Sequence, residues 1–576
     1  MLKQKFHFVL GLIVMAIILF LASLHNGRWI LVAVVPLALM YFGIKGTASM
    51  REKFYLGFGL ILMAVLLFLA MLHDGRWFFI VMLPLSMIYI YDVYQKKHAI
   101  LRNFPILGHI RFLMEFIRPE IQQYLIAGDE EERPYNRETR SLIYQRSKNI
   151  RDTIPFGTQK DILAPGYEWT LHSMNAKKPA EVEPRITVGG PQCTQPYSSS
   201  RLNISGMSFG ALSANAVMAM NLGAKIGGFA QATGEGGLSK YHLQGGDVIW
   251  QIGTGYFGCR DEKGHFSPDE FAKEALRPEV KMIELKLSQG AKPSHGGILP
   301  AAKLTPEIAA IRKAPLGQDV LSPGKHSAFS TPTEMMHFIQ KLRTLCGGKP
   351  VGFKFCLGLP HEFMGICKAM LETGITPDFI TVDGAEGGTG AAPVEFVNNV
   401  GMPLNFALSF VHNVLVGVNL RDTIRIAASG KIATGFDMVS KVAIGADICN
   451  MARPMMMATG CIQSMQCNMN TCPTGVATQD KSLARGLVVE DKKTRVANFQ
   501  RLTLHSFLEL IGAMGLSNPS ELKPYHILRR INFSEAKTFE QIYTDQGRAL
   551  APGELLKKTI PPYYAVHWQL ARTDAF

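Results

Sequence analysis

Three cysteines lie close together late in the chain. They are Cys461, Cys467 and Cys472, and Pro473 follows the last of them. Thiolates in such a run are typical ligands of iron–sulfur clusters, although this spacing matches neither the bacterial nor the plant ferredoxin pattern. A zinc site usually adds a fourth Cys or His at a matching spacing, and this stretch has none. The spacing therefore predicts a cluster with three protein ligands, either [3Fe–4S] or [4Fe–4S] with an open site.

Two short turns combine glycine or alanine with a basic residue. Ser429-Gly430-Lys431 and Ala452-Arg453 each follow a stretch typical of a β-strand. Free backbone N–H groups beside a Lys and an Arg suit a phosphate dianion, so we predict a phosphate site here. The alternative for each turn is an ordinary solvated connection.

Two further glycine-rich turns are Gly384–Gly390 and Gly234–Gly237. Glycine lets the backbone approach a flat ring closely, so each turn is either a plain loop or part of a binding site. Neither has the GxGxxG pattern at the start of a helix, which argues against a Rossmann dinucleotide site.

The elements that would position these turns alternate between strand and helix. Ile424–Ala428 and Ile448–Met451 have the pattern of strands, and Phe436–Ile444 between them has the pattern of a helix with one apolar face. Val351–Cys356 and Phe379–Asp383 are two more strand-like runs around a predicted helix. Repeated βα units over this length favour an α/β fold in the form of a closed (β/α)8 TIM barrel.

The N-terminal region has a different composition. Its apolar runs are each near the length that crosses a bilayer, and His25–Trp29 returns as His73–Trp77 at a spacing of 48 residues. We expect a pair of transmembrane helical hairpins, the alternative being a signal peptide followed by buried core helices. The runs are Phe8–Leu24, Trp29–Ile44, Phe54–Leu72 and Trp77–Tyr94.

Basic residues flank these runs mainly on one side. Lys3, Lys45 and Lys96 mark segments that the positive-inside tendency assigns to the cytoplasm. We therefore expect a multi-pass inner-membrane protein with a cytoplasmic catalytic domain. The formal net charge is +14, but Lys and Arg are dispersed, which argues against nucleic acid as a partner.

The composition changes along the chain predict four regions. They are four transmembrane helices in residues 1–95, a juxtamembrane arm and entry to the barrel in 96–185, the barrel with its cysteine loop in 186–485, and a helical C-terminal extension in 486–576.

Residues 186–485 resemble the FMN-binding synthase domain of glutamate synthase. The matching segments, in the same order, are Asn203–Ser213, Gly234–Gly237, Glu284–Pro293, Gly387–Ala392 and Cys461–Gln479. With apolar hairpins ahead of this domain, the whole chain resembles membrane-anchored bacterial FMN-binding proteins related to glutamate synthase.

The resemblance implies FMN at the barrel mouth, a [3Fe–4S] cluster, and reduction of 2-iminoglutarate, formed from 2-oxoglutarate and ammonia, to glutamate. It assigns the cofactor to Met207, Ser208, Gln251, Lys354, Gly388, Gly430, Lys431 and Arg453. It assigns the 2-oxo acid and its chemistry to Lys286, Gln289, Lys292 and Arg312, and the cluster to Cys461, Cys467 and Cys472. Cations are sensible partners for a dicarboxylate that leaves water.

The chain departs from the family pattern in two ways. Ser294-His295-Gly296-Gly297-Ile298 stands where the family usually has Gly-Glu-Gly-Gly-Gln, so an aliphatic side chain replaces a polar substrate contact. No segment resembles the glutaminase domain, so we expect ammonia from solution or from a partner protein. No NAD(P)H site is visible, so we expect an external electron donor, and a homo-oligomer is compatible with the sequence.

Two other functions stay open. One is a related FMN enzyme acting on a different substrate, through methylglutamate-synthase-like amine transfer or 2-hydroxy acid oxidation. The other is a non-catalytic redox or scaffold protein that keeps its cofactors.

Overall fold

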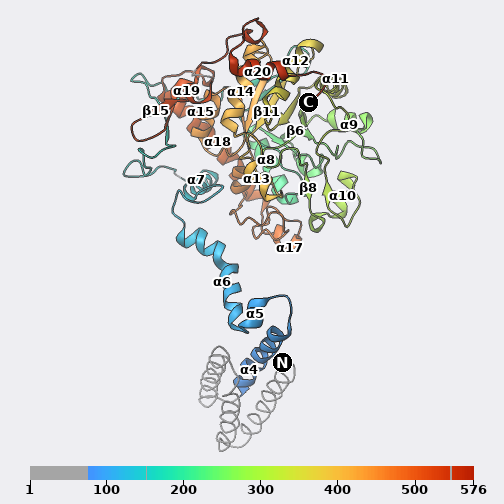
Figure 1. The fold of residues 1–576 in the computed structure, drawn as a ribbon, viewed down its shortest axis with the longest axis vertical. Coiled ribbons are helices and arrows are strands. Elements are labelled where there is room, and N and C mark those ends of the chain that lie inside the picture. Colours follow the sequence, from blue (N-terminus) through green and yellow to red (C-terminus); the bar gives the residue numbers. More distant parts are fainter. Residues whose placement is uncertain (1–75, 151, 545–547) are drawn as a thin grey trace, which may run out of the picture. The chain divides into compact units, whose positions relative to one another are not determined.

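The computed structural model describes residues 76–150, 152–544 and 548–576 (Figure 1). The chain divides into two compact units, Met1–Gly128 and Asp129–Phe576, and each is described by itself.

The described part of the first unit is helical. It contains α4 (Arg76–Tyr94), α5 (Ala99–Asn103), α6 (Leu107–Ile121) and a π-helical turn, η1 (Gln122–Ile126). The buried carboxylate of Asp92 accepts hydrogen bonds from the backbone N–H of Ile106 at 2.9 Å and from His109 Nε2 at 2.9 Å. The last turn of α4 is thus held to α6 by polar contacts.

The prediction of transmembrane hairpins is wrong on the described residues. None of the helices in residues 76–150, 152–544 and 548–576 is long and apolar enough to cross a bilayer, so the predicted multi-pass inner-membrane location is corrected with it. The physical reason is visible in the run Trp77–Tyr94, where Asp92 and Pro84 interrupt the apolar sequence. The other three runs, Phe8–Leu24, Trp29–Ile44 and Phe54–Leu72, lie outside the described residues.

The second unit contains a closed barrel of eight parallel strands, which confirms the barrel prediction (Figure 1). In barrel order the strands are β4 (Leu202–Ile204), β5 (Ala230–Ala232), β6 (Asp247–Ile252), β7 (Val280–Lys286), β10 (Val351–Phe355), β11 (Phe379–Asp383), β12 (Arg425–Ser429) and β13 (Ile448–Met451). Nearly every position in these strands is buried, as expected where helices cover the outside of a parallel sheet.

Helices surround the barrel. They are α8 (Ala214–Gly227), α9 (Pro268–Ala275), α11 (Pro332–Leu345), α12 (Pro360–Thr373), α14 (Leu404–Gly417), α15 (Gly435–Ala443), α16 (Arg453–Ala458) and α18 (Val489–Ala513). Side chains of Ser213, Ser267, Thr331 and Thr434 cap the starts of four of them, which satisfies N–H groups that have no partner within a helix. The longest, α18, packs against α8 and α15, and Gly223 permits that contact because a Cβ there would lie 2.7 Å from Val496.

The predicted βαβ unit in 424–451 is confirmed. The strand expected at Ile424–Ala428 is β12, the helix expected at Phe436–Ile444 is α15, and the last strand is β13. Met438, Val439 and Val442 form the buried face of α15, as the helical periodicity predicts.

Shorter elements complete the unit. They are α7 (Arg137–Ser147), α10 (Pro306–Arg312), α13 (Val394–Asn399), α17 (Lys481–Ala484), α19 (Phe539–Tyr543), α20 (Pro562–Leu570), the hairpin of β2 (Ile186–Val188) and β3 (Tyr197–Ser199), the pair β8 (Ile298–Leu299) and β9 (Val320–Leu321), and the 3-10 turns η2 (Lys240–His242), η3 (Ala301–Lys303), η4 (Pro519–Glu521), η5 (Pro524–His526) and η6 (Glu554–Leu556). The C-terminal extension is only partly helical, because β14 (Ile527–Arg530) pairs with β1 (Glu168–Thr170) and β15 (Ala536–Thr538).

Candidate functional site

The carboxyl ends of the barrel strands bring most of the predicted site residues to one rim. Lys286 ends β7, Lys354 lies near the end of β10, and the loops after β4, β11, β12 and β13 carry most of the others. Active sites of such barrels lie at this rim, since side chains from several strands and loops converge there.

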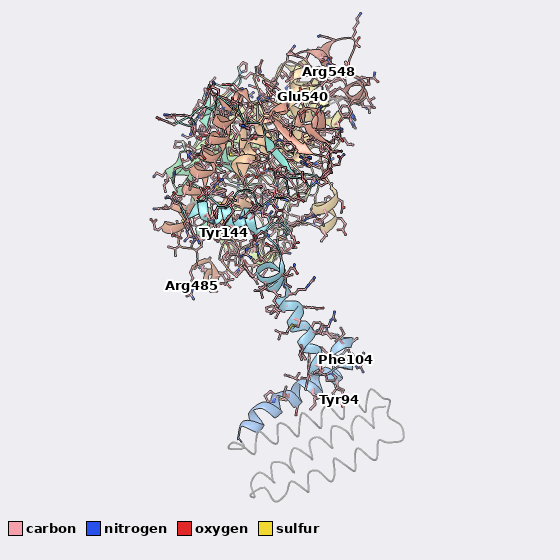
Figure 2. The ribbon with its side chains drawn as sticks, turned by 90° about the vertical axis from the view of Figure 1, so that its left-hand side faces the viewer. Tyr94, Phe104, Tyr144, Arg485, Glu540 and Arg548 are labelled. Carbon is pink, nitrogen blue, oxygen red and sulfur yellow. The ribbon has the colours of Figure 1, made fainter. Side chains whose placement is uncertain are left out.

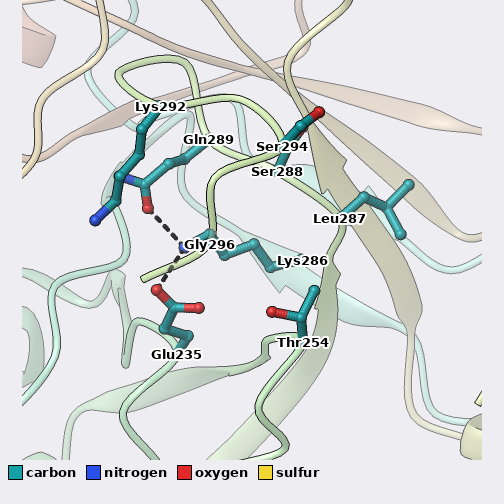
Figure 3. Close-up of a pocket in the computed structure, with 9 residues that line it drawn as sticks. All are labelled: Glu235, Thr254, Lys286, Leu287, Ser288, Gln289, Lys292, Ser294 and Gly296. Atoms are coloured by element: carbon teal, nitrogen blue, oxygen red, sulfur yellow. Dashed lines mark hydrogen bonds and ion pairs between the residues drawn. The ribbon is translucent and has the colours of Figure 1, made fainter. Parts of the chain in front are cut away.

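A small pocket at the rim joins three of the predicted residues (Figure 3). The ammonium of Lys286 donates to Gln289 Oε1 at 2.6 Å and forms an ion pair with Glu235 Oε1 at 2.9 Å. Lys292 also lines the pocket, and its ammonium donates to the carbonyl of Ala391 at 2.8 Å. The turn at Gly234–Gly237 is therefore part of the site, because it supplies Glu235.

The charges in this pocket act strongly on one another. Burial by itself raises the pKa of a carboxyl, but the ammonium groups of Lys286 and Lys292 and the guanidinium of Arg312 outweigh it, so the pKa of Glu235 is lowered. Burial, followed by the neighbouring charge of Lys286, lowers the pKa of Lys292 to about 8. One carboxylate thus faces three cations, which leaves positive charge for an anionic ligand.

Arg312 lies beside the candidate cofactor loop rather than on the lining of this pocket. It ends α10 and is 4% exposed, and its Nη2 donates to Ser208 Oγ at 3.3 Å and to the carbonyl of Phe209 at 3.4 Å. Its Nε is buried without a hydrogen-bond partner in the structure. Burial lowers the pKa of Arg312 to about 10, although Glu235 opposes the effect. A buried donor of this kind has capacity for a further acceptor.

Two predicted cofactor residues form buried polar contacts in the barrel. Lys354 forms an ion pair with Asp383 Oδ2 at 3.5 Å, and the same oxygen accepts a hydrogen bond from the N–H of Gly290 at 2.8 Å. Gln251 Nε2 donates to Glu284 Oε2 at 2.5 Å. Asp383 therefore holds the loop that carries Gln289 and Lys292 against β10 and β11.

The loops after β11, β12 and β13 form a cradle with two cations. Arg453 Nη2 donates to the carbonyl of Glu386 at 2.6 Å, and a Cβ on Gly388 would lie 2.7 Å from Arg453 Nε, so a side chain there would displace the Arg453 side chain. Lys431 follows Gly430, and neither Lys431 nor Arg453 forms an ion pair within 4.0 Å in the described chain, although the charges of Glu386 and Asp437 act on Lys431 from farther away. Burial, and then the charge of Arg453, lower the pKa of Lys431. Two cations without an ion-paired carboxylate beside a glycine turn fit a phosphate dianion.

The three cysteines of the predicted cluster share one loop. Cys461, Cys467 and Cys472 are free thiols. Tyr144 of α7, labelled in Figure 2, donates its hydroxyl to the carbonyl of Cys461 at 2.8 Å, so α7 lies against the start of this loop. The three cysteines have the chemistry of thiolate ligands. However, no group of three or more His, Cys, Asp or Glu side chains among the described residues is arranged to hold a metal ion.

The three thiols differ in acidity. Burial raises the pKa of Cys461 to about 12 and also raises the pKa of Cys467. Burial acts in the same direction on Cys472, but hydrogen bonds from backbone N–H groups, first that of Ala477, outweigh it and lower the pKa. Of the three thiols, Cys472 is the one whose surroundings lower its pKa.

The segment that departs from the family pattern lies beside the pocket. Ser294 and Gly296 line it, and Ile298 begins β8, where it pairs with Leu321. The His295 ring packs edge-on against Phe396 with centroids 5.1 Å apart, and its Nδ1 is buried without a partner in the structure. The segment beside the pocket thus combines an aliphatic side chain with an imidazole nitrogen that has no hydrogen-bond partner in the structure.

Sequence reasoning did not assign roles to Glu235 and Asp383. The glycine turn around Glu235 was a usable signal, since a carboxylate between glycines at a strand end is exposed to neighbouring loops. The sequence signal for Asp383 was weaker, because an acidic residue at the end of a strand is common and its partners Lys354 and Gly290 are distant in sequence.

Comparisons with known proteins identify the family of this chain. The model of the family described as the conserved region in glutamate synthase matches residues 134–517. The glutamate synthase large subunit-like protein YerD of Bacillus subtilis (strain 168) is 38% identical over 77% of this chain and 92% of its own length. The archaeal glutamate synthase [NADPH] of Methanocaldococcus jannaschii is 34% identical over 56% of this chain, and the match spans 60% of that relative. A solved mandelate oxidase aligns with a TM-score of 0.38 and 14% identity over 70% of this chain and 96% of its own, a level that says nothing about function.

Proposed function

Because this chain belongs to the glutamate synthase family, and is therefore an oxidoreductase acting on CH–NH2 donors, we propose that it reductively aminates 2-oxoglutarate to glutamate through 2-iminoglutarate. The observation that carries this proposal is the charge of the rim. Lys286, Lys292 and Arg312 act together on Glu235, which leaves more positive than negative charge where the substrate would bind. A dicarboxylate matches that excess better than a monocarboxylate does.

FMN is the proposed cofactor. Bound flavin would supply the hydride that an imine carbon accepts. Lys431 and Arg453, with the glycine backbone at 388 and 430, would hold its phosphate. Met207, Ser208, Gln251 and Lys354 would hold the rest of the molecule, and the ion pair with Asp383 keeps Lys354 in place for this.

The substrate residues have distinct tasks in this proposal. Arg312 would hold one carboxylate in a bidentate fork, because its planar guanidinium matches the two oxygens. The hydrogen bond to Gln289 and the ion pair with Glu235 orient Lys286 before substrate binds. Such preorganisation removes part of the entropic cost of aligning the reacting groups.

The cysteine loop is the proposed site of an iron–sulfur cluster, with Cys461, Cys467 and Cys472 as ligands. In support, the three thiols are free and lie on one loop. Electrons would come from an external donor, and ammonia from solution or a partner protein.

A second candidate is a related flavin enzyme that acts on a different amine or oxo acid. Ile298 and the unsatisfied His295 favour it, because together they present a less polar and differently placed set of contacts than the usual Glu and Gln. Turnover on a panel of amines, 2-hydroxy acids and 2-oxo acids would separate the two candidates, and absence of turnover on all of them would favour a non-catalytic redox protein.

The proposal is tested on full-length protein purified without oxygen. We expect a flavin spectrum and reoxidation of the chemically reduced protein by 2-oxoglutarate plus ammonium, but not by either alone. Lys431→Ala and Arg453→Ala should each weaken FMN retention by about 2–5 kcal/mol if the phosphate contact is desolvated. Purified protein without flavin, or reoxidation that ignores 2-oxoglutarate, would contradict the proposal.

The cluster is tested separately. Cys472→Ser should remove most of the iron and labile sulfide, because a hydroxyl is a poor ligand for iron. Cys449→Ser is the matched control, since Cys449 is a buried free thiol in β13 outside the loop. Equal iron content in the two variants would refute the cluster assignment.

A further inference from the structure

A single buried lysine lies between the candidate substrate region and the cysteine loop. Lys303 ends the 3-10 turn η3, and only 2% of its surface is exposed. Its ammonium donates to three backbone carbonyls, those of Ala211, of Cys467 at 3.2 Å and of Ala477 at 3.0 Å. The side chain thus joins the loop after β4 to two points of the cysteine loop.

Other contacts strengthen the same junction. Asn470 Nδ2 donates to the carbonyl of Ala302 at 3.0 Å. Gln479 Nε2 donates to the carbonyls of Gly210 at 3.0 Å and Leu212 at 2.7 Å. The cysteine loop, the turn η3 and the loop after β4 are therefore tied together, and Lys303 carries the charge at their centre.

This ammonium lacks a carboxylate counterion, which some of the other buried cations have. Lys286 pairs with Glu235, Lys354 with Asp383, and Arg343 with Asp378, whereas Lys303 forms no ion pair with a carboxylate in the described chain. Carbonyl dipoles orient an ammonium but do not neutralise it, and an unpaired buried charge is costly. Burial lowers the pKa of Lys303 to about 8, and the acidic groups that oppose this effect are the thiols of Cys467 and Cys472.

We propose that Lys303 is the built-in countercharge of the cysteine loop, a positioning residue that holds this loop and electrostatically favours a negatively charged, thiolate-bound centre in its reduced state. The inference rests on the proposed cluster and goes beyond it, because it assigns a role to a residue that is not a ligand. Negative charge on the bound centre would compensate the ammonium of Lys303, which is held beside the cysteine loop by the carbonyls of Cys467 and Ala477.

The test compares variants of two buried lysines. Lys349 is the control, since it is 8% exposed and its ammonium donates to the carbonyls of Ala275 and Arg277, both at 2.7 Å, where no cysteine loop lies. Lys303→Met, Lys303→Arg and Lys349→Met are purified anaerobically as full chains. Iron and sulfide per chain, and the midpoint potential from a redox titration followed by electron paramagnetic resonance, are measured for each.

Removing a cation destabilises the more negative, reduced state, so the midpoint potential of Lys303→Met should fall. We expect about a tenfold change in the one-electron equilibrium, ~59 mV, and less iron per chain. The midpoint potential of Lys303→Arg should stay close to the wild-type value. Lys349→Met should keep the wild-type midpoint potential, although its folded state should be less stable. Lys303→Gln repeats the test if the Met variant is not recovered.

The outcomes separate this inference from the proposed function. Wild-type protein without iron and sulfide would overturn the cluster and the inference together. A cluster of unchanged potential and content in Lys303→Met would overturn the inference alone. The inference would also be overturned if the midpoint potential of Lys303→Arg fell as far as that of Lys303→Met. The role of Lys303 would then be packing rather than charge.

Discussion

The two rims of the barrel handle buried charge in different ways. At the amino-terminal rim, Asp378 immediately precedes β11, and its carboxylate accepts hydrogen bonds from the N–H groups of Gly190 at 2.7 Å and Val351 at 2.8 Å. It also forms an ion pair with Arg343 at 3.0 Å, and both side chains are almost fully buried. Each charge at this point has a partner of opposite sign.

The carboxyl-terminal rim has an excess of cations at the other ends of the same strands. Glu235 faces the charges of Lys286, Lys292 and Arg312, and Lys431 and Arg453 have no carboxylate partner in the described structure. Unsatisfied polar atoms also occur here, at Arg312 Nε and His295 Nδ1. A satisfied network mainly stabilises a fold, whereas an unsatisfied one has affinity left for a ligand. Substitutions at the two rims should therefore fail in different ways.

The largest effect is expected at the amino-terminal rim, and on stability. Asp378→Ala leaves Arg343 buried without a counterion and removes the acceptor for two N–H groups, so unfolding should become easier by about 3–5 kcal/mol. Chemical denaturation measures this loss. The kcat/KM of the molecules that remain folded and flavin-loaded should stay near the wild-type value. A specific loss of kcat/KM at unchanged stability would show that the two rims are not divided in this way.

At Arg312 we expect the opposite pattern, a loss of kcat/KM with little loss of stability. If its guanidinium clamps a substrate carboxylate, Arg312→Ala should lower kcat/KM for the oxo acid by about 10²-fold or more, with a smaller change in stability. Arg312→Lys should recover little, because a point charge does not reproduce the planar fork. Steady-state kinetics of both variants decide this. Full activity of Arg312→Ala would remove this residue from the substrate site.

The difference between the rims also explains how much the sequence could predict. Strands such as Phe379–Asp383 and Ile448–Met451, and the helix at Phe436–Ile444, follow from local apolar periodicity, so their bounds were close to those observed. The glycine and lysine turns were found because their composition is unusual at strand ends. Periodicity and composition carry this much of the barrel.

Long-range partners could not be predicted in the same way. The pairing of Lys286 with Glu235 and of Lys303 with the cysteine loop joins segments that meet only after the barrel closes. The membrane prediction failed for a related reason. The high average hydropathy of Trp77–Tyr94 gave little weight to the single charged residue Asp92, whose partner His109 lies in α6. Sequence patterns report what a segment is made of, and tertiary contacts decide what its charged residues do.

A smaller effect sharpens the comparison through pH. Burial and Lys286 lower the pKa of Lys292 to about 8, so its ammonium loses its charge as the pH rises through that value. Because the charged form binds carboxylate, kcat/KM for the oxo acid should fall by about tenfold between neutral pH and pH values well above 8. Lys292→Arg keeps its charge over this range, and its pH profile serves as the control. Identical descents in the two profiles would assign the pH dependence to another group.

The smallest effect tests the chemistry of the edge formed by His295 and Ile298. Ile298 pairs with Leu321 through backbone hydrogen bonds of β8 and β9, so a side-chain change there should leave the local fold intact. If 2-oxoglutarate is the substrate, Ile298→Gln should be neutral or improve kcat/KM by about 1 kcal/mol, the net contribution of one neutral hydrogen bond.

If the enzyme instead uses a more apolar oxo acid, the same change should weaken that substrate, because the new amide would be desolvated without a partner. Kinetics of wild type and Ile298→Gln with 2-oxoglutarate, oxaloacetate, pyruvate and 2-oxoisovalerate distinguish these cases, and Ile298→Leu is the control for changed shape without added polarity. Glutamate formation would be ruled out if the wild type preferred a monocarboxylate and Arg312→Ala left kcat/KM unchanged. The flavin and cluster proposals would survive that result, since they depend on Lys431, Arg453 and the three cysteines rather than on this edge of the pocket.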